Sequence, residues 1–146
     1  MDYRIMNGTC YARIDKGEEI IESLLDICRK EGIKSAVFTG IGGCSRADLQ
    51  TFIPEEGTFE TETIEGMLEL INITGNIVSD DEDKLFHHTH AVFSFKEGEE
   101  HKMAAGHMKA VYVLYTAEIE LRPVTDGVIR RKYDPETGTG FWHFGD

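Results

Sequence analysis

Three histidines in one short apolar stretch are the residues of this sequence best suited to chemistry. The segment "LFHHTHAVFSF", residues 85–95, holds His87, His88 and His90, half of the chain's six histidines. Its apolar flanks predict a strand, in which side chains two apart share a face with Cα atoms about 6.5–7 Å apart. His88 and His90 can therefore converge on one ion, whereas His87 points to the opposite face.

A third imidazole is expected from the strand that follows. The intervening segment "KEGEEHK" contains Gly98-Glu99, which suits a two-residue type II′ turn with glycine at its first central position. A hairpin centred there places His107 directly opposite His90, and directly opposed residues share a face with Cβ atoms about 4.5–5.5 Å apart. His88, His90 and His107 then surround one point. A slip of one residue would turn His107 to the other face, so the prediction depends on this turn.

Three neutral imidazoles that leave a fourth position open are the usual ligands of a catalytic zinc site. We therefore expect these three histidines to bind a metal, with zinc as the first choice, although imidazole also suits nickel, copper and iron. The alternative is that the histidines lie on a half-exposed strand and pair with carboxylates of the segment 97–100. We favour this alternative for His87 and His101.

The open position would bind a small ligand or water. If the site is catalytic, the metal would lower the pKa of bound water toward ~7 and so supply hydroxide for hydrolysis or lyase chemistry. Glu118, in "YTAEIEL", is a weak candidate for a general base or a supporting carboxylate, and surface carboxylates are commoner. The sequence names no substrate, so we predict neither an enzyme nor a set of catalytic residues.

Two other motifs favour structural roles. The run "GIGG", Gly40–Gly43, follows an apolar strand as a phosphate-binding loop would, but the next segment does not open a helix. A tight turn or a close backbone contact is the better interpretation. The cysteines have no basic or histidine neighbour in sequence, so we expect buried structural thiols at Cys10, Cys28 and Cys44.

One amphipathic helix is well marked in "DKGEEIIESLLDICRKEGI". Its apolar residues recur with helical spacing and form a single stripe, namely Ile20, Ile21, Leu24, Leu25 and Cys28. Acidic Glu18 and Glu19 are expected in the first turn and basic Arg29 and Lys30 in the last turn, which matches the helix dipole. Gly32 is expected to end the helix.

Most of the remaining chain has the alternation and composition of strands. The predicted strands cover 3–14 as a strand or hairpin, 34–43, 46–53, 58–78 with breaks at Gly66 and Gly75, 85–95, 103–108 and 110–121. In the last of these, alternation puts Val113, Tyr115 and Ala117 on one face. Many strands and one helix without β–α–β alternation predict an α+β fold with a largely antiparallel sheet.

The length of 146 residues suits a single domain, 1–146, with a core of about 3–134. Residues 135–146 form an aromatic C-terminal tail that includes Phe141, Trp142 and Phe144. Such a tail packs back on the sheet or docks on a neighbouring subunit.

The composition argues for an acidic protein of a reducing compartment. The net charge is −12 and the pI about 4.9, which disfavours DNA binding because that draws on Lys and Arg contacts to phosphates. The only basic cluster, residues 130–132, suits a solvated loop. Three widely spaced cysteines and the lack of a secretory signal or a long apolar run predict a cytoplasmic location without membrane insertion.

The order of several short motifs resembles the PPC domain, a domain of plants and prokaryotes also called DUF296. These motifs are "GIGG" (Gly40–Gly43), "ITGNI" (Ile73–Ile77), "HTHA" (His88–Ala91), "AGH" (Ala105–His107) and "YTAEIEL" (Tyr115–Leu121). The resemblance extends from about Tyr3 to the aromatic tail. One departure is Ala105, which stands where the family more often has glycine; this concerns backbone packing and not metal ligation.

The resemblance implies an α+β domain that assembles as a homotrimer. In prokaryotic members an H-x-H pair and a later G-H histidine accompany bound metal, typically zinc, and these match His88, His90 and His107. Plant members carry AT-hooks, and prokaryotic relatives are often described as DNA-binding, but this chain has no R-G-R-P hook. Two alternatives to the metal-binding protein with a small ligand therefore stay open: a DNA-binding or transcription-associated protein, and a protein-assembly module.

Overall fold

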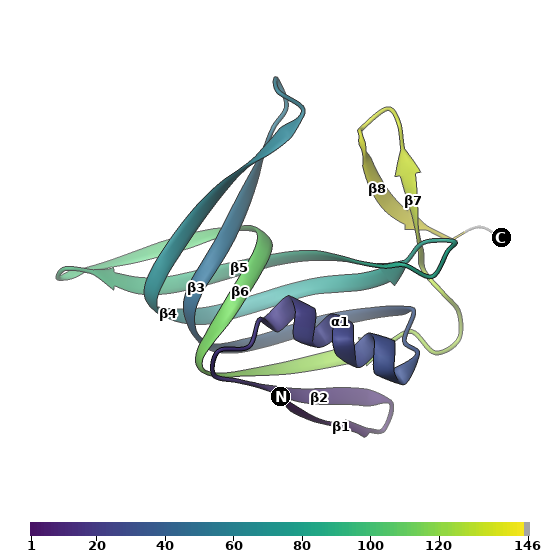
Figure 1. Ribbon diagram of the computed structural model, residues 1–146, viewed down its shortest axis with the longest axis horizontal. Coiled ribbons are helices and arrows are strands. Elements are labelled where there is room, and N and C mark those ends of the chain that lie inside the picture. Colours follow the sequence, from purple (N-terminus) through teal and green to yellow (C-terminus); the bar gives the residue numbers. More distant parts are fainter. Residues whose placement is uncertain (145–146) are drawn as a thin grey trace.

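A computed structural model describes residues 1–144, which form a strongly bent sheet with one helix on a face (Figure 1). The elements in chain order are β1 (Asp2–Met6), β2 (Thr9–Asp15), α1 (Ile20–Glu31), β3 (Ser35–Ile53), β4 (Thr58–Ser79), β5 (Leu85–Glu97), β6 (Glu100–Pro123), β7 (Arg130–Asp134) and β8 (Thr139–His143). Apart from one parallel bridge between β4 and β7, the pairs of named strands are antiparallel. The predicted α+β fold is confirmed.

Helix α1 packs its apolar stripe on the sheet, and both of its ends follow from local chemistry. Gly32 ends the helix in the left-handed conformation at φ 66°, where a Cβ would be strained. The expected acidic first turn is wrong for Glu18 and Glu19, which both precede the helix. Glu19 is instead its N-cap and accepts backbone N–H groups of Ile21 and Glu22 and, across to β6, of Val111.

The long strands are continuous where the sequence predicted separate pieces. The segments 34–43 and 46–53 belong to β3, and 103–108 and 110–121 belong to β6, with bulges between the pieces. The glycine run Gly40–Gly43 lies inside β3. A Cβ at Gly42 would meet the β6 backbone, with the carbonyl oxygen of Thr116 only 2.7 Å away. The predicted close backbone contact is confirmed, because glycine lets two bent strands approach each other.

Four strands pair in a closed circuit, and the three candidate histidines lie where β6 changes from one partner strand to the other. β3 pairs with β4, β4 with β5, β5 with β6, and β6 again with β3. β6 serves two partners in turn: residues 100–107 pair with β5, and 107–123 pair with β3. His107, at the change of partner, pairs with both His90 of β5 and Gln50 of β3. The part of β5 that precedes His90, residues 85–89, therefore has no partner in β6.

Hairpins project beyond the body of the sheet in different directions (Figure 1). The far end of β3 and β4, joined by residues 54–57, forms one of them, the β5–β6 pair forms another, and the C-terminal pair β7–β8 projects as well. The aromatic tail thus forms part of a hairpin, and Trp142 reaches back to the sheet by donating its indole N–H to Asn76 of β4 at 3.1 Å. Residues 145 and 146 of the predicted tail lie outside the described residues.

The core lies between α1 and the concave face of the sheet. It contains the helix stripe and the inward side chains of β2 to β6, and all three cysteines are fully buried and unpaired. Burial raises the pKa of the Cys28 and Cys44 thiols to about 12, so neither is a thiolate at neutral pH. The expectation of buried structural thiols is confirmed. Among residues 1–144 no helix has the length and apolarity that a membrane span requires.

Candidate metal centre

Strand alternation in β5 separates core residues from the candidate ligands. Thr89, Ala91 and Phe93 point inward and are buried, whereas His88 and His90 lie on the open face. His87 shares the inward parity, and its Nδ1 lies 3.1 Å from the Thr89 hydroxyl. The predicted split of the histidine cluster is confirmed.

The third histidine, His107, is placed opposite His90 by the predicted hairpin between β5 and β6. Gly98 has φ 61° while Glu99 keeps a negative φ, as a type II′ turn requires. The register from that turn pairs Glu97 with Glu100 and continues without a bulge to His90 opposite His107. The sequence therefore predicted this register correctly.

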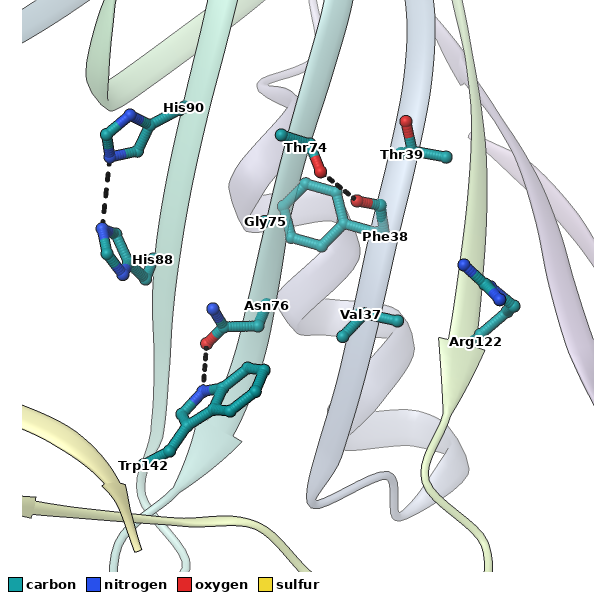
Figure 2. A pocket seen from close by; sticks show the side chains of 10 residues that line it. All are labelled: Val37, Phe38, Thr39, Thr74, Gly75, Asn76, His88, His90, Arg122 and Trp142. Carbon is teal, nitrogen blue, oxygen red and sulfur yellow. Dashed lines mark hydrogen bonds between the residues drawn. The ribbon is translucent and has the colours of Figure 1, made fainter.

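The three imidazoles face one another across a small space. The ring centroids of His88, His90 and His107 are 5.1, 5.2 and 5.4 Å apart in the three pairs. One nitrogen from each ring lies within 4.8 Å of the other two, and His88 Nε2 and His90 Nε2 are 3.2 Å apart. Figure 2 shows these two nitrogens pointing toward each other from β5.

This spacing fits a transition metal. Two imidazoles on one tetrahedral zinc ion have nitrogens about 3.3 Å apart, because each Zn–N bond is ~2.0–2.1 Å long. The His88–His90 pair already has that separation, and a ring nitrogen of His107 lies within 4.8 Å of both. Since the three residues come from one face of two paired strands, the opposite side of the ion would stay open to solvent.

Burial favours the neutral form that metal ligation needs for two of the three imidazoles, those of His88 and His107. Burial, reinforced by the neighbouring histidines, lowers the pKa of His107 to about 4. The pKa of His88 is also lowered, first by burial and then by His90. Neutral imidazoles bind a cation without first losing a proton. Among residues 1–144 no histidine forms an ion pair with a carboxylate, so the alternative role of pairing with residues 97–100 finds no contact here.

Two other candidates lie away from the group. His101 is exposed near the β5–β6 turn. Glu118 is exposed on β6, opposite Arg13 and Ile41, and does not line either cavity beside the histidines. Its weak candidacy as a base gains no support from this placement.

Two cavities adjoin the histidines. The smaller, of about 330 Å³, lies along β3, β4 and β5 and is lined by Thr74, Asn76, His88, His90 and Trp142 among others (Figure 2). The larger, of about 980 Å³, includes all three candidate ligands and extends between the β3–β4 hairpin and the β7–β8 hairpin. The Trp142–Asn76 hydrogen bond lies where the two meet.

Several cavity residues were not singled out from the sequence. Phe52 and Phe59 come from the β3–β4 hairpin, and Arg131 comes from the basic cluster that was predicted to be a solvated loop. The sequence predicted that the aromatic tail packs on the sheet or on a neighbouring subunit. Its position beside the histidines depends on the chain returning along β4, and no local sequence pattern indicates this return.

The fold and the site define a class: an antiparallel-sheet protein with an amphipathic helix on one face and a group of three imidazoles at an open strand junction. The model of the Plants and Prokaryotes Conserved (PCC) domain matches residues 2–125, and the chain belongs to this family. The predicted resemblance is confirmed. A comparison with curated protein sequences gives no match.

Solved structures share this fold over nearly the whole chain. A plant- and prokaryote-conserved (PPC) protein from Pyrococcus horikoshii has 28% identity, covers 99% of this chain and 96% of its own, and superposes with a TM-score of 0.82. A candidate DNA-binding protein from Bacteroides thetaiotaomicron has 24% identity, coverages of 98% and 96%, and a TM-score of 0.87. A metal-containing protein from Archaeoglobus fulgidus has 22% identity, coverages of 98% and 97%, and a TM-score of 0.82.

Proposed function

We propose that this protein binds a divalent transition metal, with zinc as the first choice, through His88, His90 and His107. The observation that carries the proposal is that one nitrogen of each imidazole lies within 4.8 Å of the other two, and that all three residues line a cavity of about 980 Å³. A three-imidazole set leaves a position for a small ligand, which the cavity is large enough to hold.

The strand pairing of β5 and β6 explains how the three histidines are positioned for a metal. His90 and His107 are fixed by direct cross-strand pairing, and His88 is fixed by the alternation of the same strand. A bound metal would supply a Lewis-acidic position beside the cavity. Among residues 1–144 no carboxylate lines the cavity, so these residues offer a place to bind a ligand but no carboxylate base.

The relatives add limited support. The Archaeoglobus fulgidus protein is described as metal-containing, but at 22% identity it shows the shared fold alone. The proposal therefore depends on the imidazole geometry of this chain.

Metal analysis tests the proposal directly. Untagged protein, purified without metal-affinity steps and then dialysed against a zinc buffer, should retain about one zinc per chain. The H88A/H90A/H107A variant should retain none, because three of the four zinc positions are lost. His101→Ala is the matched control: it removes an exposed histidine of the same strand as His107 and should keep the metal. Equal zinc contents in the wild type and the triple variant would refute the site.

We also propose a homotrimer that acts in the cytoplasm as a single domain, 1–146. The central strands expose large apolar side chains, and exposed apolar patches mark contact surfaces. Tyr115 of β6 is 67% exposed and Met67 of β4 is 41% exposed; both lie over Gly43, within 3.5 Å of where its Cβ would be. Three unpaired buried cysteines suit a reducing compartment.

DNA binding and protein assembly are the competing functions. The similar protein from Bacteroides thetaiotaomicron is described as DNA-binding, which favours DNA as a ligand. The net charge of −12 of this chain disfavours DNA binding. The basic cluster 130–132 is also partly engaged, since Arg130 pairs with Asp83 and Arg131 stacks on Phe86. A pure assembly module would keep its oligomer and its partners unchanged after the three histidines are replaced.

A further inference from the structure

The C-terminal hairpin presents two side chains to the cavity beside the histidines. Arg131 of β7 and Trp142 of β8 are directly opposed in the hairpin register, so they lie on the same face. Both line the larger cavity, whereas Arg130 and Lys132, on the other face of β7, do not. This hairpin lies beyond residue 125, where the family match ends.

The Arg131 guanidinium is held in place but has no anionic partner. It stacks on the ring of Phe86 at 4.6 Å, and a Cβ at Gly140 would collide with it, so the glycine leaves room for this position. Within residues 1–144 no carboxylate pairs with Arg131, in contrast to Arg130, which is 2.8 Å from Asp83. A guanidinium carries five N–H donors in a planar fork, and stacking on a ring leaves these free at its edge.

The position of Phe86 relates this guanidinium to the histidines. Phe86, His88 and His90 are alternate residues of β5 and so lie in a row on one face, with successive Cα atoms about 6.5–7 Å apart. Arg131 stands over the first member of this row and the metal-ligand group begins at the second. One small molecule could therefore reach both.

The remaining lining combines aromatic side chains with neutral polar ones, and among residues 1–144 it contains no carboxylate. Phe59 stacks on His107 with ring centroids 5.5 Å apart and planes at 26°, and Phe52 lies 5.2 Å from Phe59. The chain contains 27 acidic residues, yet none of those within residues 1–144 lines this cavity. A positive charge between aromatic walls selects a flat apolar body with a compact anionic group.

We infer that the cavity is the binding site for a small organic carboxylate with a flat apolar body. The carboxylate is bound by Arg131, the body lies between the aromatic walls, and a donor atom of the molecule can occupy the open position at the histidines. This inference rests on the proposed function for the metal end of the site, while the anion end depends on Arg131 alone.

Equilibrium dialysis of naphthoate and naphthamide tests the inference with a matched pair that differs in charge. Zinc-loaded wild-type protein should bind naphthoate more tightly than naphthamide. Arg131→Gln should weaken naphthoate binding by about tenfold to a hundredfold, the worth of a charged hydrogen-bonded pair, and remove the preference. Lys132→Gln, the same charge change on the outer face of β7, should leave both affinities unchanged.

A second readout comes from Trp142, the single tryptophan of the chain. Its indole N–H, which is hydrogen-bonded to Asn76 in the cavity, should shift in the NMR spectrum on addition of naphthoate. The inference is overturned if naphthoate does not bind, or if Arg131→Gln and Lys132→Gln bind it alike. Zinc content, measured separately on each variant, distinguishes these outcomes from failure of the metal site. A protein that holds no zinc but keeps Arg131-dependent naphthoate binding refutes the proposed function and supports the anion subsite.

Discussion

His107 is the residue of the candidate site with the most contacts to its other parts. It pairs with His90 on one side, stacks on Phe59 on another, and stands where β6 changes partners. Burial and three neighbouring imidazoles lower its pKa to about 4, so a proton and a metal ion compete for this nitrogen only at acidic pH.

This shift predicts how the metal-free protein responds to acid. Between the ordinary histidine pKa of 6.5 and the folded value of about 4, the unfolded chain binds a proton at residue 107 that the folded chain does not. Stability is therefore present above pH 6.5 and is lost as the pH falls toward 4. For half-exposed groups screened by solvent, we expect a fall in unfolding free energy on the order of 1 kcal/mol from this residue.

Urea unfolding of zinc-free protein at several pH values between 7 and 4 measures this effect. Because many carboxylates titrate in the same range, the informative quantity is the difference between the wild type and His107→Gln. The variant should lose less stability on acidification. Parallel pH profiles for the two proteins would contradict the prediction.

At the scale of elements, close strand crossing makes the junction. Gly42 lies at a bulge where β3 crosses β6, and an added methyl group would meet backbone atoms, Ala117 Cα at 2.8 Å among them. Backbone of a central strand cannot move aside as the end of a side chain can, so the glycine is required by packing.

Gly42→Ala should accordingly destabilise the protein by about 1–3 kcal/mol, the usual cost of overpacking. Gly127→Ala is the control, because a Cβ there meets nothing within 4 Å and the residue lies outside the strands; it should change stability by less than about 0.5 kcal/mol. Urea denaturation midpoints compare the two. Similar denaturation midpoints for both variants would contradict the prediction, because they would mean that the β6 backbone moves to accommodate the added methyl group.

At the scale of the whole molecule, the exposed apolar surface and the acidic charge have different consequences. The net charge of −12 disfavours phosphate-rich partners, while exposed side chains such as Tyr115 and Met67 favour contact with another protein surface. The proposed homotrimer would bury this patch.

Tyr115→Glu should convert the trimer to a monomer, because it places a charge in an apolar interface. Light scattering after gel filtration should then give one third of the wild-type mass, close to the 16.5 kDa of the chain. Tyr133→Glu is the matched control, since Tyr133 is 60% exposed but lies on β7, away from the patch. A monomeric wild type, or the same mass for both variants, would contradict the trimer.

Local signals account for the parts of the fold that the sequence predicted. The helix stripe and Gly32, the β5 alternation, and the Gly98-Glu99 turn are short-range features, and together they sufficed for the α+β class and for the convergence of His88, His90 and His107. The turn between two strands sets the register of a hairpin, which explains why three candidate ligands from two strands could be predicted to converge.

Only the tertiary structure decided the continuity of the long strands and the surroundings of the site. Alternation placed Tyr115 with the buried Val113 and Ala117, yet it is exposed because β6 bulges there against β3. Likewise, Arg131 and Trp142 belong to a hairpin that returns beside β4 across more than fifty residues of chain, as the Trp142–Asn76 bond shows. Sequence periodicity describes which side of a strand a residue takes; it holds no information on which distant strand lies opposite, because non-local packing sets that choice.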